Sequence, residues 1–226
     1  MAEHFIASLL GITDEQAMWR VQRQDDAEAF ARLMTRWEAP IRELCRRMTG
    51  DVHRGEDLTQ EAFARVYARR KDYQPTGKFS TWLWRIALNL CYDELRRLKR
   101  RSETSLDGAA ELDGDAGMDL PDAEAVGPDG ALVAQETGDE VRRALQRLSE
   151  AHRAVLVLRH YEDLKFREIA EVLGVPEGTV KSRMSEALTQ MGRHLARSGG
   201  PVITGLPLPK KPTDSSAKRN EPSLVL

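Results

Sequence analysis

The stretch Glu56–Arg101, EDLTQEAFARVYARRKDYQPTGKFSTWLWRIALNLCYDELRRLKRR, predicts two amphipathic helices joined by a loop that carries Pro75 and Gly77. Apolar side chains recur at three- and four-residue spacing in both helices, the pattern of one buried helical face. The first set is Leu58, Ala62, Phe63, Val66 and Tyr67, and the second is Trp82, Ile86 and Leu90, followed by Asp93 and Arg97.

Large aromatic and basic residues are interleaved in the segment Phe79–Arg85, FSTWLWR. Aromatic faces among cations suit unpaired bases, because any base can stack on them while the phosphates are neutralised. A buried core would use the same aromatics. Trp82 and Trp84 are two positions apart, about 200° around a helix, so one should be exposed while the other packs.

Upstream of this stretch, Asp25–Met48 predicts a helix with a kink or break at Pro40. The segment Thr49–Asp51 is a helix stop signal, and the next helix is expected to begin at Glu56, after Gly55. The apolar residues of the upstream helix are Phe30, Leu33, Met34, Trp37, Ile41, Leu44 and Met48.

The leader Met1–Gln24 contains one helix start, with Thr13 as N-cap and Gln16 in the capping-box position. It has no basic region before its short apolar run, so it matches neither a signal peptide nor a membrane span. We expect an intracellular protein. Cys45 and Cys91 lack partners at metal-ligand spacing and predict buried free thiols in a reducing compartment.

Charge is distributed unevenly along the 226 residues, whose net charge is −2. Ser102–Glu136 holds ten acids and no Lys or Arg, which leaves +8 on the rest of the chain. This linker, residues 102–137, is rich in Gly, Asp, Ala and Pro without apolar periodicity. It is expected to be disordered in isolation and could be a solvated spacer. Ser198–Leu226 predicts a flexible tail.

The segment Gly138–Arg197 predicts a second helical domain that ends in a helix-turn-helix. Ser149 is the expected N-cap of one of its helices. A short apolar-faced helix is followed by the turn Gly174–Pro176 and a long helix with a polar opposite face. The apolar residues of that last helix are Val180, Met184, Leu188, Met191 and Leu195.

Two motifs together resemble the sigma factors of bacterial RNA polymerase. FSTWLWRIALN followed by DELRR, within residues 79–97, resembles sigma region 2, and EIAEVLGVPEGTVKSR, residues 168–183, resembles region 4. The order and spacing are similar to the small extracytoplasmic-function (ECF) group. The resemblance implies an all-α protein of two small helical domains, region 2 at residues 25–101 and region 4 at 138–197, joined by the acidic linker. Residues 1–24 and 198–226 fall outside it.

The resemblance also implies a function without bond chemistry: binding core polymerase, recognising promoters, melting DNA and starting transcription. The implied partners are the coiled coil of the largest polymerase subunit, the flap of the second-largest subunit and promoter DNA. Many relatives are also held inactive by an anti-sigma factor between or around the domains, which the resemblance allows here. The linker would thread toward the polymerase active site. No catalytic residue, cofactor or metal is expected, nor membrane insertion, and the protein would lie in the cytoplasm on the nucleoid.

Three groups of residues carry the implied contacts. Asn89 could pair with an adenine edge, and basic side chains would hold phosphates. For −10 recognition and melting the candidates are Lys78, Phe79, Ser80, Trp82, Trp84, Arg85, Asn89, Arg96 and Arg97, with Lys99, Arg100 and Arg101 as further phosphate contacts. For binding to core polymerase the candidates are Asp57, Gln60 and Glu61. For −35 recognition they are Thr179, Lys181, Ser182, Arg183 and Glu186.

Several alternatives remain at this point. Glu56 and Asp57 could simply complement a helix dipole, and Arg96–Arg101 could be a solvated helix end. Many relatives have a basic residue where Glu186 stands, which leaves the promoter sequence open. The competing function is a stand-alone helix-turn-helix regulator that binds duplex DNA without polymerase. An enzyme has little support, because the five histidines form no catalytic motif.

Overall fold

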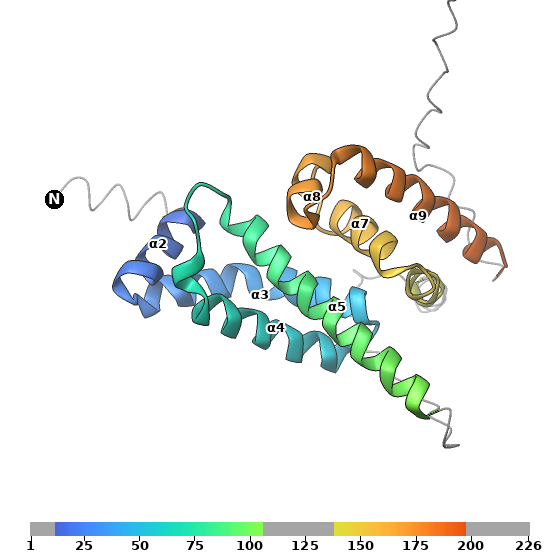
Figure 1. The fold of residues 1–226 in the computed structure, drawn as a ribbon, viewed down its shortest axis with the longest axis horizontal. Coiled ribbons are helices and arrows are strands. Elements are labelled where there is room, and N and C mark those ends of the chain that lie inside the picture. The colour runs from blue at the N-terminus through green and yellow to red at the C-terminus, as the bar shows by residue number, and fades with distance from the viewer. Residues whose placement is uncertain (1–11, 106–137, 198–226) are drawn as a thin grey trace, which may run out of the picture.

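The computed structural model describes residues 12–105 and 138–197, and within these ranges the regular structure is helical. The elements form two bundles that lie side by side (Figure 1), an N-terminal bundle (residues 12–105) and a C-terminal bundle (residues 138–197). The helices are α2 (Asp14–Gln24), α3 (Ala27–Thr49), α4 (Val52–Ala68), the 3₁₀ turn η1 (Arg70–Asp72), α5 (Phe79–Ser105), a segment at residues 138–146, α7 (Glu150–His160), α8 (Phe166–Leu173) and α9 (Glu177–Arg197).

The first helix, α2, begins where its capping residues predict. Thr13 accepts a hydrogen bond from the Gln16 backbone, and the Gln16 side chain accepts one from the Thr13 backbone. Met18 and Val21 are fully buried against α3. The bundle therefore includes a helix that lies within the leader segment.

The long helix α3 runs unbroken from Ala27 to Thr49, so of the kink or break predicted at Pro40 the structure contradicts the break. A proline removes only one donor from the helix ladder, and the flanking residues Leu33, Ile41 and Leu44 hold both sides of the helix in the core. The helix ends as predicted at Gly50, whose φ of 79° is left-handed.

The next helix, α4, begins four residues before the predicted start at Glu56. Asp51 is its N-cap and accepts from the Arg54 backbone at 3.0 Å, so the first turn forms upstream of Gly55. Gly55 lies inside the helix. A side-chain carbon there would meet the Arg46 backbone at 3.0 Å, so a glycine is favoured at this position. Close packing of α3 on α4 thus explains a glycine that the sequence pattern suggested was a boundary.

The last helix of the N-terminal bundle, α5, extends to Ser105 and so runs into the segment expected to be disordered. Leu83, Ala87, Leu88 and Cys91 form its buried face. The remainder of the acidic linker and the C-terminal tail lie outside the described residues. Cys45 and Cys91 are buried free thiols, as predicted.

The C-terminal bundle contains the predicted helix-turn-helix. Ser149 caps α7, accepting from the His152 backbone, and α8 ends at Gly174 with φ 66°. On α9 the apolar positions face inward as predicted, with Val180, Met184 and Leu195 buried.

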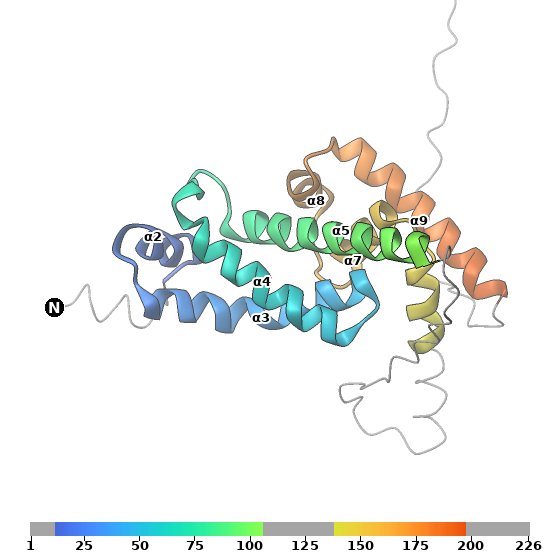
Figure 2. The same cartoon turned by 60° about the horizontal axis from the view of Figure 1, so that its bottom comes forward.

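The two bundles share one hydrophobic core rather than two separate ones. Helix α7 contacts α3, and α8 contacts α5. Figure 2 shows α8 beside the N-terminal half of α5, with α7 behind that helix. Residues far apart in sequence therefore meet at the interface between the bundles.

Candidate nucleic-acid interface

The loop between η1 and α5 is held by one hydrogen bond within it and by others from α2. Tyr73 is buried, and its hydroxyl donates to the Gly77 carbonyl at 3.0 Å. Gln22 of α2 donates to the carbonyls of Lys71 and Tyr73 at 3.1 and 2.9 Å. Burial, with Glu15 and then Asp14 nearby, raises the pKa of Tyr73 to about 12, so the hydroxyl keeps its proton.

The same leader helix supplies a contact that the sequence patterns did not reveal. Glu15 of α2 accepts a hydrogen bond from the Phe79 backbone N–H at 3.1 Å, at the first residue of α5. A carboxylate at a helix N-terminus satisfies an orphan donor and complements the helix dipole. Asp14, beside it, accepts from the indole of Trp37 and from Arg36. No local pattern could identify these pairs, because each joins separate helices.

The aromatics at the start of α5 have different environments. Phe79 is 0% exposed and Trp84 is 3% exposed, and the ring of Trp84 packs edge-on against Trp37 at 5.7 Å. Trp82 is only partly buried and tilts against Tyr73 at 5.3 Å. The structure places Phe79 and Trp84 in the core, so direct DNA contact by either would require that core to open.

The polar candidates near this loop lie at the surface. Lys78, Arg85 and Asn89 are exposed, and Ser80 is partly buried. A cavity of about 330 Å³ is lined by loop residues, by Trp82 and by both cations. One of its lining residues, Glu171, comes from α8 of the other bundle. The loop, one tryptophan and two cations are therefore brought together as the sequence predicts, with α8 against them.

Arg96 and Arg97 lie elsewhere. They are eleven or more positions after Arg85, about 16 Å along the helix at 1.5 Å per residue. Arg96 pairs with Asp93 at 3.0 Å and Arg97 with Glu94 at 2.8 Å. Arg97 lines a separate groove between α4 and α5, so these two arginines do not form one cluster with Lys78 and Arg85.

The candidates for polymerase contact lie on α4, whose residues form one side of this second groove. Asp57, Gln60 and Glu61 are exposed on α4. Asp57 and Glu61 line the groove, whose volume is about 560 Å³, while Glu61 also pairs with Arg65 at 2.8 Å. The structure therefore presents the three side chains on one face of a single helix.

The polar face of α9 carries the remaining candidates. Lys181, Ser182 and Glu186 are exposed, whereas Thr179 and Arg183 are partly buried. Lys181 pairs with Glu177 at 2.6 Å, and Glu186 accepts from Gln190 at 3.0 Å. Arg183 lies within electrostatic reach of Tyr92 on α5, and this nearby cation acts to lower the pKa of that phenol, although burial raises it to about 12 overall.

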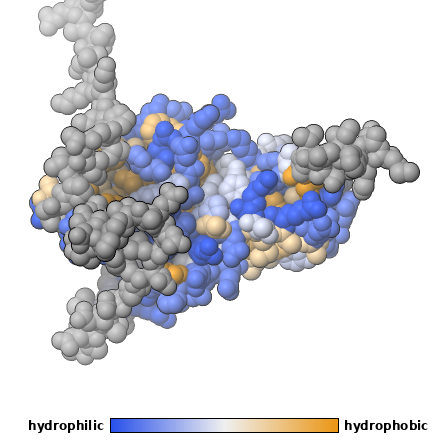
Figure 3. Space-filling view, turned by 180° about the vertical axis from the view of Figure 1, so that it is seen from behind, coloured by the Kyte–Doolittle hydropathy of each residue, from blue (hydrophilic) through white to orange (hydrophobic). Residues whose placement is uncertain are grey.

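The face seen in Figure 3 is coloured mostly hydrophilic, with smaller apolar areas. Within residues 12–105 and 138–197, no cluster of three His, Cys, Asp or Glu side chains could hold a metal ion. None of the described helices is both long and apolar enough to cross a membrane.

Comparison with family models identifies both bundles. Residues 27–101 match sigma-70 region 2, and residues 138–191 match sigma-70 region 4. The first match covers α3, α4 and most of α5, and the second covers α7, α8 and most of α9.

Relatives match most of the chain. It is 37% identical over 179 residues to the ECF RNA polymerase sigma factor SigW of Bacillus subtilis strain 168, which covers 76% of this chain and 94% of SigW. It is 32% identical over 179 residues to the ECF RNA polymerase sigma-E factor of Escherichia coli K12, covering 78% and 91%.

Solved structures agree with the fold. The sigma factor RpoE in its complex with the anti-sigma factor NepR from Bartonella quintana superposes with a TM-score of 0.60 at 20% identity, covering 75% of this chain and 98% of that one. CnrH, solved in complex with the cytosolic domain of CnrY, gives 0.59 at 20% identity, covering 81% and 97%. The chain therefore belongs to the ECF group of the sigma-70 family and is a sigma factor that directs transcription initiation.

Proposed function

We propose that this sigma factor binds core RNA polymerase through α4, reads the −10 element with the loop before α5, and reads the −35 element with α9. The observation that carries the proposal is the separation of these surfaces. The acidic face of α4 lines one groove, the cationic start of α5 lines another together with Glu171 of α8, and α9 belongs to the C-terminal bundle.

Each surface has chemistry that fits its role. Asp57 and Glu61 would pair with basic residues of the polymerase, while Gln60 adds an uncharged hydrogen-bonding group. At the −10 element, Lys78 and Arg85 would hold phosphates and Trp82 would stack on an unpaired base, while Asn89 and Ser80 offer polar contacts. Phe79 and Trp84 support this surface from within the core.

The remaining basic residues of α5 suit a phosphate-binding role further along the DNA. Arg96 and Arg97 are exposed, so their carboxylate partners could exchange for phosphates. On α9, the reading face would be formed by Thr179, Lys181, Ser182, Arg183 and Glu186.

A stand-alone regulator is not favoured, because such a protein would leave the region 2 match unexplained. The polymerase is proposed as partner because the relatives are named as RNA polymerase sigma factors. The flap contact, an acidic linker that enters the polymerase, a nucleoid location and an anti-sigma partner remain predictions from the family resemblance.

Run-off transcription with purified bacterial core polymerase on genomic promoter fragments tests the proposal. Specific transcripts are expected only when the protein is present. Glu61→Lys should abolish them and prevent co-purification with core. Glu28→Lys is the matched control, because Glu28 is also an exposed helical acid paired with an arginine four residues on, at 2.7 Å. Duplex binding by the protein alone, without transcripts, would contradict the proposal.

A further inference from the structure

Helix α2 carries an exposed tryptophan without an aromatic partner. Trp19 is 46% exposed, the largest fraction among the four exposed large apolar side chains of residues 12–105 and 138–197. Trp37, Trp82 and Trp84 each contact another ring, whereas Trp19 contacts none within those residues. Helix α2 also precedes the region 2 match, which begins at residue 27, so that match assigns it no role.

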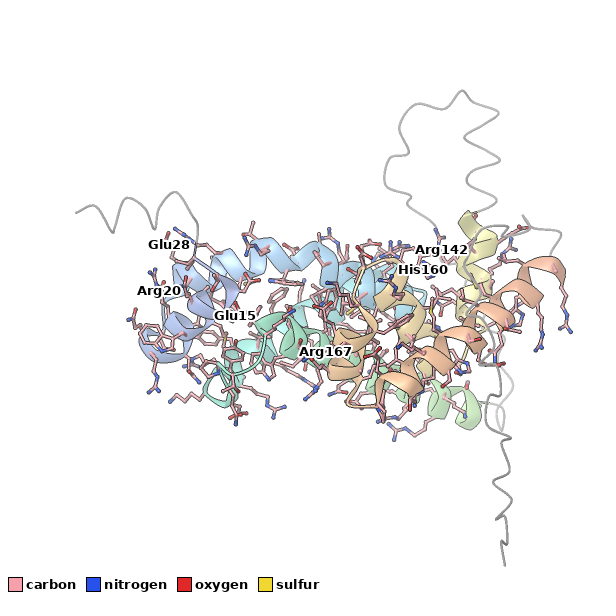
Figure 4. All side chains as sticks on the ribbon, turned by 90° about the horizontal axis from the view of Figure 1, so that it is seen from above. Glu15, Arg20, Glu28, Arg142, His160 and Arg167 are labelled. Atoms are coloured by element: carbon pink, nitrogen blue, oxygen red, sulfur yellow. The ribbon has the colours of Figure 1, made fainter. Side chains whose placement is uncertain are left out.

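Helical spacing places Trp19 on the side of α2 that faces the loop between η1 and α5 (residues 73–78, the −10 loop). It lies four positions after Glu15 and three before Gln22, so the three side chains share one side of the helix. Glu15 accepts from the Phe79 backbone at 3.1 Å, and Gln22 donates to two backbone carbonyls at the start of the loop. In Figure 4, Glu15 lies on the side of α2 toward the rest of the N-terminal bundle, and Arg20 lies on its outer side. Trp19 is therefore the exposed member of a helix face that already contacts both ends of the loop.

Two cations beside Trp19 have no acidic partner. Arg23, four positions after Trp19, and Lys71 of η1 are exposed, and neither side chain forms an ion pair within the residues that the structure describes. The backbone of Lys71 is bonded to α2, because its carbonyl accepts from the helix at 3.1 Å. The nearby acids Asp25 and Asp72 each pair with another arginine, at 2.7 and 3.1 Å. Positive charge is therefore left uncompensated next to the indole ring.

This combination has the chemistry of a site for single-stranded nucleic acid. A base of any identity can stack on an exposed indole, while neighbouring cations neutralise the phosphates. Duplex DNA keeps its bases stacked on one another, so it offers no base face to a ring at the protein surface. An apolar protein partner would leave the two cations unused. The observations therefore favour an unpaired strand over either of these partners.

The site lies where a melted strand would pass after the −10 loop. In the proposed function, Arg96 and Arg97 hold phosphates near the end of α5 that leads to the −35-reading bundle, and the loop at the opposite end captures unpaired bases. Helix α2 contacts that opposite end, at the first residue of α5. We propose that Trp19 and Arg23 form a second single-stranded DNA site, which holds the captured strand immediately downstream of the −10 element. Lys71 adds a phosphate contact between the two sites, and the inference rests on the proposed function.

Oligonucleotide binding to the holoenzyme, core polymerase with this protein bound, tests the second site. One fluorescein-labelled single strand carries the −10 element of a promoter mapped by run-off transcription, followed by about ten downstream nucleotides, a length that includes several stacking positions. A second strand ends at the −10 element. Fluorescence anisotropy measures both dissociation constants. In the wild type the longer strand should bind more tightly by at least about tenfold, as expected for one base stacked on an aromatic ring.

A double variant and a matched control locate that advantage on α2. Trp19→Ala combined with Arg23→Ala should weaken binding of the longer strand by about tenfold and leave binding of the shorter strand unchanged. The control is Met34→Ala combined with Arg32→Ala on α3, because Met34 is 37% exposed and Arg32 is an exposed arginine that pairs with Glu28 at 2.7 Å. It should bind both strands as the wild type does. An unchanged affinity of the α2 variant for the longer strand would overturn the proposal.

Two further measurements separate a DNA contact from a purely structural role. Trp19→Phe keeps a ring and should retain most of the affinity for the longer strand, whereas Trp19→Leu is only apolar and should not. Arg23→Ala alone should reduce the slope of log affinity against log salt by about 0.7, the value for one phosphate of a single strand. Equal affinities of the Phe and Leu variants, or an equal loss for both strands, would make α2 only a support for the loop and would overturn the contact.

The outcomes distinguish this inference from the proposed function. The α2 double variant should co-purify with core polymerase as the wild type does, and loss of co-purification would make Trp19 and Arg23 a polymerase contact instead. If the wild-type holoenzyme binds neither strand, the −10 assignment itself fails. The second site is then decided by the free protein, whose affinity for oligothymidylate should fall by about tenfold in the double variant. Equal affinities there would overturn the site.

Discussion

At the scale of single residues, Trp82 and Trp84 show how one helix divides two similar side chains. Their separation predicts opposite faces, and the structure buries Trp84 while Trp82 stays partly accessible beside Lys78. Which tryptophan packs depends on Trp37, which contacts Trp84 from α3. The tryptophan that stays accessible, and that we propose meets DNA, is therefore selected by a neighbour in another helix.

Trp82→Ala should impair promoter melting while leaving core binding intact, because the side chain borders the candidate −10 cavity. Permanganate reactivity of unpaired thymines measures melting, and co-purification measures core binding. Phe79→Ala is the comparison: it removes a fully buried ring and should cost about 3–5 kcal/mol of unfolding free energy. Equal losses of melting and of binding to core polymerase in Trp82→Ala would assign Trp82 to the hydrophobic core of the bundle.

Glu186→Arg should change the preferred −35 sequence. Glu186 is exposed on α9, where a carboxylate can accept from a cytosine amino group but repels phosphate. Selection from a promoter library randomised at the −35 element measures the preference, with wild type selected in parallel. An unchanged consensus would remove Glu186 from the reading face.

At the scale of elements, α2 acts as a support for the loop and for α5. Gln22 holds the loop carbonyls, and Glu15 caps α5 across 64 positions of sequence. The loop that is expected to meet DNA is thus fixed by a helix from the leader segment. Fixed geometry matters there, because stacking and phosphate contacts need their partners placed in advance.

Glu15→Ala should destabilise the N-terminal bundle by about 0.5–2 kcal/mol, the usual range for losing an N-terminal cap. Urea unfolding measures the change. Glu38→Ala is the control, because Glu38 is an exposed acid whose pair with Arg42 lies within α3. The same loss in both variants would mean that the cap contributes nothing specific.

At the scale of the whole molecule, the interface between the bundles contains an acid whose pKa depends on the packing of the two bundles against each other. The side chain of Glu162 is 8% exposed, and it lies 3.9 Å from Arg47. Burial, together with Glu43, raises its pKa to about 7 from 4.5, while Arg47 opposes the shift. Glu162 lines a cavity that Asp163 and Glu168 also line. The protein with its bundles packed together therefore binds a proton that a solvent-exposed Glu162 would release.

The sign of this linkage predicts that the two bundles pack together more favourably at lower pH. A raised pKa stabilises the packed arrangement fully below about pH 4.5, and that stabilisation is lost as the pH rises through about 7. The wild type should therefore be more compact at pH 6 than at pH 8, and the ratio of separated to packed bundles should change by roughly tenfold, since one pKa unit corresponds to about 1.4 kcal/mol.

Small-angle scattering of the free protein measures this compaction. Glu162→Gln should abolish the difference between the two pH values. His160 acts in the opposite sense, because burial and Arg159 lower its pKa, and it is present in both proteins. The difference between wild type and Glu162→Gln therefore isolates Glu162, and identical pH dependence in the two would contradict the assignment.

The sequence by itself determined the helical class, the capped starts at Thr13 and Ser149, the stop at Gly50 and the helix-turn-helix. These features depend on side chains within a few positions of one another, so periodicity and capping reveal them. It also determined the family, because the residues of each motif, region 2 and region 4, follow one another without interruption in the sequence.

The tertiary structure alone decided which aromatics are buried, where α4 begins, and what the cations contact. Gly55 reads as a boundary until α3 packs on it, and Arg153 meets Met48 across 105 positions. Such contacts depend on the chain folding back on itself, and local spacing carries no record of them. Lys78 and Arg85 could be recognised in the sequence as DNA-binding candidates, but only the packing of the two bundles shows that α8 already holds them.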